Sequence, residues 1–298
     1  MNICILLNSK FVDLALVFLN SLFINNKKNK FDIYLLYSDL NNNEIAKLDN
    51  FINNHDSKLI KLKINKKIFD NFINNSDYPN EVYYKLLMAK LVPNDVKRLL
   101  FCDVDIIVNK SISDLYNTDF KGATLAAVSD YFVNKYDKKH LANLDLNEHN
   151  YFNVGIMLIN LEKFRKFDFL DKSVDILNKY GKFIKYPEQD ILNIIFKDKV
   201  LYLDEKYNYI SKIRGFSDGF NYIINKNNIL ESLCIIHYAG IKPFNELYDG
   251  KYYEIFWKYV KKSNSNYNYE LINGKRKHKF LIILLMRIYR CIFHIKRK

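Results

Sequence analysis

The sequence contains few of the residues on which metal-bound, disulfide-linked or extended proteins depend. Only four cysteines occur among 298 residues, at Cys4, Cys102, Cys234 and Cys291, and no two of them form a CxxC pair. This spacing argues against a zinc ribbon and fits a reducing compartment. Eight glycines and four prolines are too few for a collagen-like or linker-dominated chain.

Acidic residues are missing from one end of the chain. The sequence has 46 Lys and Arg against 33 Asp and Glu, a formal charge of +13, but residues 275–298 hold nine basic residues and no acidic one. Without those nine charges, the first 274 residues carry only +4. A nucleic-acid-binding protein usually spreads its basic residues over the fold. The excess in one terminal segment instead indicates an anionic membrane surface as partner, and we expect no nucleic acid.

The apolar residues that are present make up 49% of the chain, a globular proportion that excludes a disordered protein. Short apolar runs alternate with segments of helical periodicity, which is typical of an α/β fold with a mostly parallel sheet covered on both faces. We expect strands at residues 3–7, 31–37, 59–64, 98–105, 123–128, 154–159 and 233–236, and helices at residues 14–22, 42–54, 83–92 and 190–196.

The last part of the chain differs in composition from the rest. Residues 261–279 are typical of a linker, and residues 280–295 are apolar except for Arg287, Arg290 and His294, which would form one polar stripe on a helix. This apolar segment is shorter than the roughly 20 residues that span a bilayer. A terminal helix packed on the core would show the same stripe, but the uncompensated cations favour an amphipathic helix lying in a membrane surface.

Two carboxylates follow one of the predicted strands. Asp103-Val104-Asp105 ends the apolar run of residues 98–105. In extended backbone, side chains two residues apart point to the same side, and ligands of such sheets bind at the carboxyl ends of the strands. Mn²⁺ or Mg²⁺ would remove the repulsion between the carboxylates and bridge them to a diphosphate. Asp-x-Asp alone is a weak signal for such a site, because the motif also occurs often by chance in surface loops.

A second segment carries groups of matching chemistry. The apolar run of residues 233–236 leads into His237, Gly240 and Lys242. An imidazole beside carboxylates favours manganese over magnesium, a glycine lets the backbone approach a phosphate, and a lysine supplies a point charge. A single histidine after a strand is more often structural, but together with Asp-x-Asp it indicates a metal–diphosphate site.

Four motifs together resemble those of glycosyltransferase family 8, and most closely its bacterial lipopolysaccharide galactosyl- and glucosyltransferases. They are RLLFCDVDIIV, YFNVGIMLINLEKF, YPEQDILNIIF and IIHYAGIKPF, in the family's order and spacing. The resemblance implies a Rossmann-like nucleotide-sugar domain of the GT-A type over residues 1–260. Composition and charge predict that a linker and a basic membrane-associating tail follow in residues 261–298. The resemblance also implies a divalent metal, a UDP-hexose donor and transfer with retention at the anomeric carbon.

The resemblance assigns roles to individual residues as well. It implies that Asp103, Asp105 and His237 hold the metal and that Gly240 and Lys242 contact the phosphates. The residues implied to line the donor sugar and the reacting carbon are Asp130, Asn153, Glu188 and Gln189. On spacing alone, Asn153 would be a polar residue at a strand edge, and Glu188 and Asp190 would be favourable charges at a helix N-terminus.

Three parts of the sequence depart from the family's pattern. Lys85 stands in a helix where the family commonly has Arg, so the charge is kept and the bidentate fork is lost. In the first loop, Leu6-Leu7-Asn8 stands where the family usually has Ala-x-Asp, and Phe11 is the later aromatic. Asn8 can still bond a uracil edge, and Phe11 can stack on the ring. Glu188 stands where many relatives have Asp.

These features predict a retaining hexosyltransferase that uses UDP-glucose or UDP-galactose and acts on a glycan or glycolipid such as lipopolysaccharide core. We expect it in the cytoplasm, bound peripherally to the inner membrane through residues 275–298. The apolar N-terminus lacks a basic n-region and is expected to be a strand and a helix, not an export signal. Alternatives are a catalytically weak UDP-sugar-binding protein and a two-metal phosphoryl transferase, although no P-loop or third nearby carboxylate supports the latter.

Overall fold

The computed structural model describes residues 1–70, 72, 80–146, 151–211, 229–246, 248, 250–263, 265–268, 270 and 272. The strands described are β1 Asn2–Leu6, β2 Asp32–Tyr37, β3 Lys58–Lys63, β4 Arg98–Cys102, β5 Ile106–Val108, β6 Leu125–Ser129, β7 Phe152–Asn160, β8 Val200–Leu203, β9 Tyr209–Ile210 and β10 Ile235–His237. The α-helices described are α1 Val12–Asn25, α2 Asn42–Asn53, α3 Met88–Leu91, α4 Ser113–Tyr116, α5 Tyr131–Tyr136, α6 Lys138–Asn143, α7 Leu161–Phe164, α8 Phe169–Tyr180, α9 Pro187–Ile195 and α11 Tyr253–Val260. The 3₁₀ helices are Ser9–Phe11, Lys66–Phe69, Asn80–Leu87, Gly181–Phe183, Glu205–Tyr207 and Ile229–Glu231.

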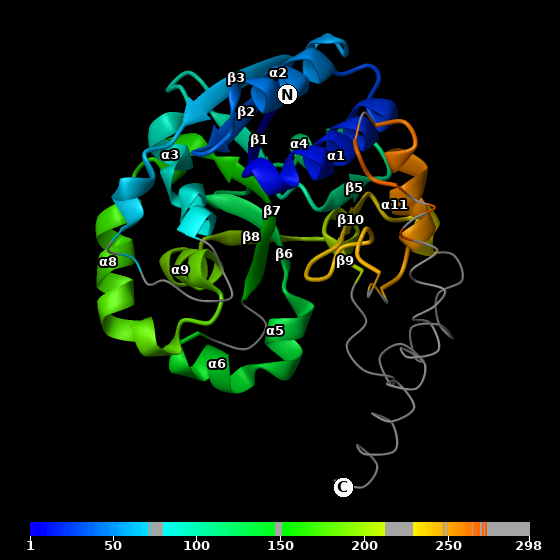
Figure 1. Cartoon of the computed structure of the whole chain (residues 1–298). Helices are drawn as coiled ribbons and strands as arrows, with labels where there is room; N and C mark the ends of the chain where they lie inside the picture. The colour runs from blue at the N-terminus through cyan, green and yellow to red at the C-terminus, as the bar shows by residue number, and fades with distance from the viewer. Residues whose placement is uncertain are drawn as a thin grey trace, which may run out of the picture.

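Within these residues the strands form two sheets (Figure 1). Seven strands make a mixed sheet in the order β3-β2-β1-β4-β7-β6-β8, and three make a smaller sheet in the order β5-β10-β9. In the large sheet β7 runs antiparallel to its neighbours β4 and β6, while the other pairs are parallel. The predicted mostly parallel α/β sheet is confirmed. The short strands β8 and β9 were not predicted.

Alternate residues of the central strands pack into two different cores, as the two-residue period of a strand requires. Ile3 and Ile5 of β1 belong to a core that includes residues of α1, α2, α11 and the small sheet, whereas Cys4 belongs to one that includes α8 and α9. Figure 1 shows α1 and α11 on one side of the large sheet and α8 and α9 on the other. Each fully buried aliphatic or aromatic side chain contributes about 1.5–3 kcal/mol, so both faces anchor the sheet firmly.

One edge of the large sheet collects the ends of several strands. Cys102, the last residue of β4, pairs with Ile156 of β7, and Ser129, the last residue of β6, pairs with Phe152 at the start of β7. The ends of β4 and β6 and the beginning of β7 therefore lie together. Ligands of α/β sheets bind at such edges.

The C-terminal prediction falls outside the part of the chain that the structure describes. Helix α11 ends at Val260, the residue at which we expect the catalytic domain to end, and residues 275–298 are not among those described. Within the described ranges, none of the helices combines the length and the apolar character that crossing a bilayer requires. Three of the cysteines, Cys4, Cys102 and Cys234, are buried free thiols.

Candidate active site

Asp103, Val104 and Asp105 form the turn that joins β4 of the large sheet to β5 of the small one. The prediction of extended backbone through Asp105 was wrong, because the chain leaves the large sheet after β4 to pair in the small sheet. Two backbone hydrogen bonds hold the turn: Asp103 N–H donates to the Gly155 carbonyl (2.7 Å), and Tyr238 N–H donates to the Asp105 carbonyl (2.8 Å). Val104 is buried, while the side chains of Asp103 and Asp105 stay 29% and 14% exposed.

His237 joins these two carboxylates. It is the last residue of β10 and pairs with Ile106 of β5, the residue that follows Asp105. One potential ligand atom from each of Asp103, Asp105 and His237 lies within 4.8 Å of the other two. His237 Nε2 is 3.3 Å from Asp105 Oδ1. The three residues that the sequence predicted as metal ligands thus meet at the junction of the two sheets, and we call them the carboxylate–histidine cluster.

Gly155 leaves the space next to the carboxylate–histidine cluster. A Cβ atom at this position would lie 2.4 Å from Cε1 of His237, 2.9 Å from Oδ1 of Asn153 and 3.0 Å from Oδ2 of Asp103. The absence of a side chain at Gly155 therefore lets these residues pack directly against β7. Two carboxylates and an imidazole held this close together fit Mn²⁺, or Mg²⁺ with its oxygen preference. The sequence analysis overlooked Gly155, although a glycine inside a strand often marks a close approach.

Lys85 contacts the cluster from below the surface. Its Nζ lies 3.0 Å from Asp103 Oδ1 and 3.1 Å from Glu188 Oε1, and the residue is only 4% exposed. Burial opposes its charge, but the two carboxylates raise the pKa of Lys85 above its ordinary value. The helix predicted over 83–92 is in fact a 3₁₀ helix over Asn80–Leu87 that continues as α3. Lys85 therefore neutralises the cluster rather than lying on a solvent face.

Lys242 contacts the cluster from the other side. Its Nζ pairs with Oδ2 of Asp105 and donates to the Tyr238 carbonyl at 3.0 Å. Burial would raise the pKa of Asp105, but Lys242 and His237 hold it well below its ordinary value. Gly240 has φ +83°, a left-handed conformation that favours glycine, in the loop that leads from β10 to Lys242.

Three of the residues predicted to line the donor sugar are hydrogen-bonded to one another. Asp130 caps α5 through Oδ1, and its Oδ2 accepts bonds from Asn153 Nδ2 (3.1 Å) and Gln189 Nε2 (3.4 Å). Gln189 Oε1 in turn accepts from the backbone N–H of Val154 (3.2 Å). All three side chains are buried. They form one rigid polar group at the edge where β6 ends and β7 begins.

Glu188 and Gln189 lie in the first turn of α9. This helix begins at Pro187, three residues before the predicted start, because proline is well suited to the first helical position. Burial raises the pKa of Glu188 in spite of its ion pair with Lys85. Neighbouring residues of one helix therefore contact Lys85, which itself pairs with Asp103, and Asp130.

Asn8 and Phe11 lie at the carboxyl end of β1, beside the end of β4, because Ile5 pairs with Cys102. Asn8 Oδ1 accepts a bond from the backbone N–H of Lys10 (3.1 Å), which caps a short 3₁₀ helix. Phe11 is half-buried against the core. Their position matches the predicted nucleotide loop, but the contacts described do not connect them with the carboxylate–histidine cluster.

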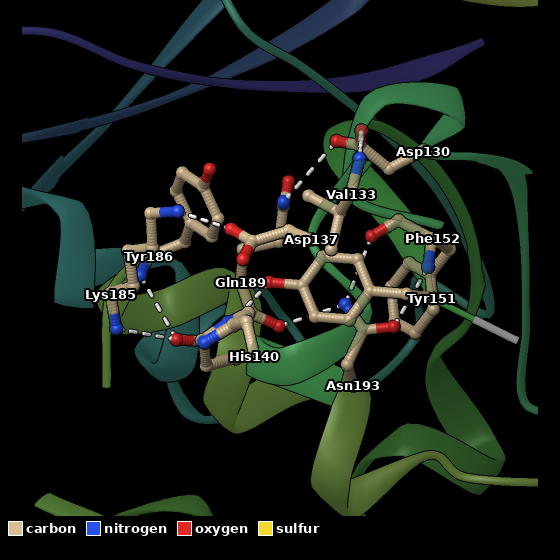
Figure 2. Close-up of polar contacts among 11 residues, drawn as sticks. Asp130, Val133, Asp137, His140, Tyr151, Phe152, Lys185, Tyr186, Gln189 and Asn193 are labelled. Atoms are coloured by element: carbon tan, nitrogen blue, oxygen red, sulfur yellow. Dashed lines mark hydrogen bonds and ion pairs between the residues drawn. The ribbon is translucent and has the colours of Figure 1, made fainter. Parts of the chain in front are cut away.

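Asp190 is itself fully buried and is bonded to four surrounding groups (Figure 2). Its Oδ1 accepts from the Tyr151 hydroxyl (2.5 Å) and lies 2.8 Å from His140 Nε2, and its Oδ2 accepts from the backbone N–H groups of Lys185 (2.8 Å) and Tyr186 (2.9 Å). The carboxylate fixes the chain that enters α9. Asp190 is thus a structural carboxylate in the first turn of α9, where a negative charge is favourable.

Asn208 is a second residue that the sequence analysis missed. Its Oδ1 lies 2.8 Å from His237 Nδ1, and its Nδ2 donates to Asn153 Oδ1 at 2.8 Å. It precedes β9, a strand of two residues without a recognisable pattern. No signal in the sequence marked this segment.

Comparisons with known proteins agree with these features. Residues 2–247 match the model of the family described as glycosyl transferase family 8. A Haemophilus influenzae protein with a glycosyltransferase name is 31% identical over 74% of this chain, and the match spans 66% of its own length. The lipopolysaccharide 1,2-glucosyltransferase of Escherichia coli K12 is 26% identical over 95% of this chain and 86% of its own.

A solved structure, that of the galactosyltransferase LgtC with donor and acceptor sugar analogues, superimposes with a TM-score of 0.77. It covers 92% of this chain and all of its own, at 21% identity. At that identity the likeness concerns the fold, and it confirms the predicted GT-A architecture.

Proposed function

The chain belongs to glycosyl transferase family 8, and on that basis we propose that it moves a hexose from a UDP-sugar to a saccharide or glycolipid acceptor with retention of configuration. The observation that carries this proposal is the convergence of Asp103, Asp105 and His237, whose ligand atoms lie within 4.8 Å of one another and two of which pack against Gly155. This donor set suits Mn²⁺ or Mg²⁺. When bound, the ion supplies Lewis-acid stabilisation of the departing UDP diphosphate.

The lysines of the site would bind and orient the donor. Lys242 pairs with Asp105 and lies in the loop where Gly240 allows close backbone approach. Its ammonium group can therefore move from Asp105 to pair with a diphosphate oxygen. Lys85 is buried between Asp103 and Glu188 and would hold both carboxylates in place. Asn8 and Phe11 would contact the uracil from the end of β1.

The sugar would lie against the group formed by Asp130, Asn153 and Gln189. Double displacement needs a carboxylate nucleophile, but Gln189 carries an amide, and both of its polar atoms are already hydrogen-bonded. We therefore propose that the acceptor attacks from the leaving-group side and that a diphosphate oxygen takes the acceptor's proton. Detection of a glycosylated Gln189 or Glu188 peptide by mass spectrometry would contradict this route.

The names of the relatives suggest the substrates. One relative is a lipopolysaccharide 1,2-glucosyltransferase and a similar structure is a galactosyltransferase, so UDP-glucose and UDP-galactose are the donors to test first. A lipopolysaccharide or lipooligosaccharide core is the acceptor proposed. Such an acceptor would place the protein in the cytoplasm, at the inner membrane.

The proposal is tested by incubating the full chain with a panel of UDP-hexoses and Mn²⁺ and measuring UDP release. We expect turnover of one UDP-hexose, with loss of activity in EDTA and recovery on adding Mn²⁺. Donor binding without turnover would instead favour a catalytically weak UDP-sugar-binding protein. If calorimetry detects no Mn²⁺-dependent binding of UDP, the proposal is wrong.

We also propose that residues 275–298, with nine basic residues and no acidic one, hold the protein at an anionic membrane. Deleting them should abolish sedimentation with anionic vesicles and leave hydrolysis of the UDP-sugar unchanged. Vesicles of neutral lipid serve as the control for the intact chain. Anionic-vesicle binding that survives the deletion would overturn this assignment.

A further inference from the structure

The orientation of the Asn153 amide is fixed by one neighbour that can only donate a hydrogen bond and one that accepts. The backbone N–H of Gly155 can only donate, and it lies 2.9 Å from one amide atom of Asn153, which must therefore be Oδ1. The other amide atom lies 3.1 Å from Oδ2 of Asp130, a carboxylate oxygen that accepts, and this atom must be Nδ2. Asn153 thus presents an acceptor oxygen to its remaining neighbour, Asn208.

The orientation of Asn208 follows from that of Asn153. Asn208 meets Asn153 Oδ1 at 2.8 Å and has to offer its own Nδ2 there. Its Oδ1 is consequently the atom that faces His237 Nδ1 at 2.8 Å. Asn208 is only 3% exposed, so water does not compete freely for either atom. The amide is held at both ends.

The consequence concerns the proton on the His237 ring. Because Asn208 Oδ1 accepts, His237 Nδ1 must carry the hydrogen, and in the neutral imidazole Nε2 is then an unprotonated lone pair. That nitrogen lies 3.3 Å from Asp105 Oδ1, which is also an acceptor. Two acceptors at this distance repel each other unless a cation lies between them.

We propose that Asn208 is a positioning residue that keeps His237 in the Nδ1–H tautomer and so leaves Nε2 free for a divalent cation. The inference rests on the proposed function, because it concerns the metal that this function requires. It extends that function to a relay in which the Gly155 backbone N–H fixes Asn153, Asn153 fixes Asn208, and Asn208 fixes the histidine. Hydrogen-bonded partners of metal-binding histidines commonly set ring orientation in this way.

The tautomer can be measured without metal or substrate. Long-range ¹H–¹⁵N spectra of the metal-free full chain with ¹⁵N-labelled histidine separate the two ring nitrogens, and the His237→Gln variant identifies the His237 signals. In alkaline buffer we expect the proton on Nδ1 and none on Nε2. In Asn208→Leu we expect it on Nε2, facing Asp105. A wild-type ring protonated on Nε2 would overturn the proposal.

Two variants then connect the tautomer to metal affinity. Asn208→Leu should weaken Mn²⁺ binding, followed by electron paramagnetic resonance of the free ion, by about 10–100-fold. Asn208→Asp still accepts from Nδ1–H, although it cannot donate to Asn153, and should retain the tautomer and bind Mn²⁺ at least about tenfold more tightly than the leucine variant.

Equal Mn²⁺ affinity in the wild type and Asn208→Leu would refute the role of Asn208. Should the leucine variant not fold, the wild-type tautomer and the aspartate variant still decide the question. Failure of the proposed function itself would look different, since the wild type would then bind Mn²⁺ without supporting UDP binding, whatever the tautomer of His237.

Discussion

The single carboxylate Asp190 and the carboxylate pair Asp103 and Asp105 have different kinds of hydrogen-bond and ion-pair partners. Asp190 is fully buried, and its oxygens are held by two backbone N–H groups, a tyrosine hydroxyl and an imidazole. Asp103 and Asp105 are partly exposed, and the charges nearest to them are the lysine side chains Lys85 and Lys242. A backbone donor cannot leave without unfolding the segment, whereas the ammonium group of the partly exposed Lys242 can rotate away.

The difference teaches which carboxylates are available for chemistry. Asp190 stabilises the fold, because each hydrogen bond to its buried carboxylate contributes about 1.5–3 kcal/mol. The lysines beside Asp103 and Asp105 instead keep two repelling carboxylates together until a stronger cation arrives. A substitution of Asp190 should therefore reduce the stability of the fold, whereas one of Asp103 or Asp105 should weaken binding.

The largest effect is expected for Asp103→Asn. Removing this charge takes one ligand from the carboxylate–histidine cluster and weakens stabilisation of the departing diphosphate, so UDP-sugar turnover should fall roughly 10³-fold, about 4 kcal/mol in the activation barrier. The urea midpoint should stay close to that of the wild type. An unfolded Asp103→Asn protein would mean that Asp103, like Asp190, is needed for the fold, and the distinction between the two would be wrong.

Asp190→Asn should show the opposite pattern. The amide keeps the shape but loses the charge-assisted bonds from Tyr151, Lys185 and Tyr186, which should lower the free energy of unfolding by about 3 kcal/mol in urea titrations. The matched control is Asp175→Asn on the exposed face of α8, which should change stability by less than about 0.5 kcal/mol. Unchanged stability with lost turnover would instead assign Asp190 to the chemistry.

The smallest effect is expected for Lys242→Met, which sharpens the comparison within the cluster itself. Because Lys242 competes for Asp105, removing it should tighten Mn²⁺ binding in the absence of nucleotide. The same change should weaken UDP binding about tenfold, or 1.4 kcal/mol, through loss of a phosphate contact. Calorimetry measures both affinities, with the exposed Lys258→Met as control. Weaker Mn²⁺ binding would show that the lysine does not compete.

The sequence predicted the fold well where apolar periodicity was strong. β1, β2, β4 and β7 have long apolar runs, and all were predicted within a few residues. Lys85 was placed in an α-helix, since its segment has helical spacing, but the chain winds there as a 3₁₀ helix. Local propensity separates these two helix types poorly.

The grouping of Asp103, Asp105 and His237 could be predicted because these residues lie in motifs with a recognisable family order. Gly155 and Asn208 could not be ranked in the same way, since their importance comes from distances to residues far along the chain. The extended turn at Asp103 was predicted wrongly for a related reason. Its geometry depends on β5 leaving for a second sheet, and pairing with β10 is a long-range event.

The turn of residues 103–105 also makes the two sheets mechanically dependent on one another. The small sheet has three short strands, which would be marginal alone, and His237 of its β10 stands opposite the turn. A metal ion bound by both Asp103 and His237 would link the two sheets. At a free-ion concentration of a hundred times the dissociation constant, binding would stabilise the joined sheets by about 2.7 kcal/mol. Resistance of β9 and β10 to proteolysis should therefore rise with occupancy of the site by the metal ion.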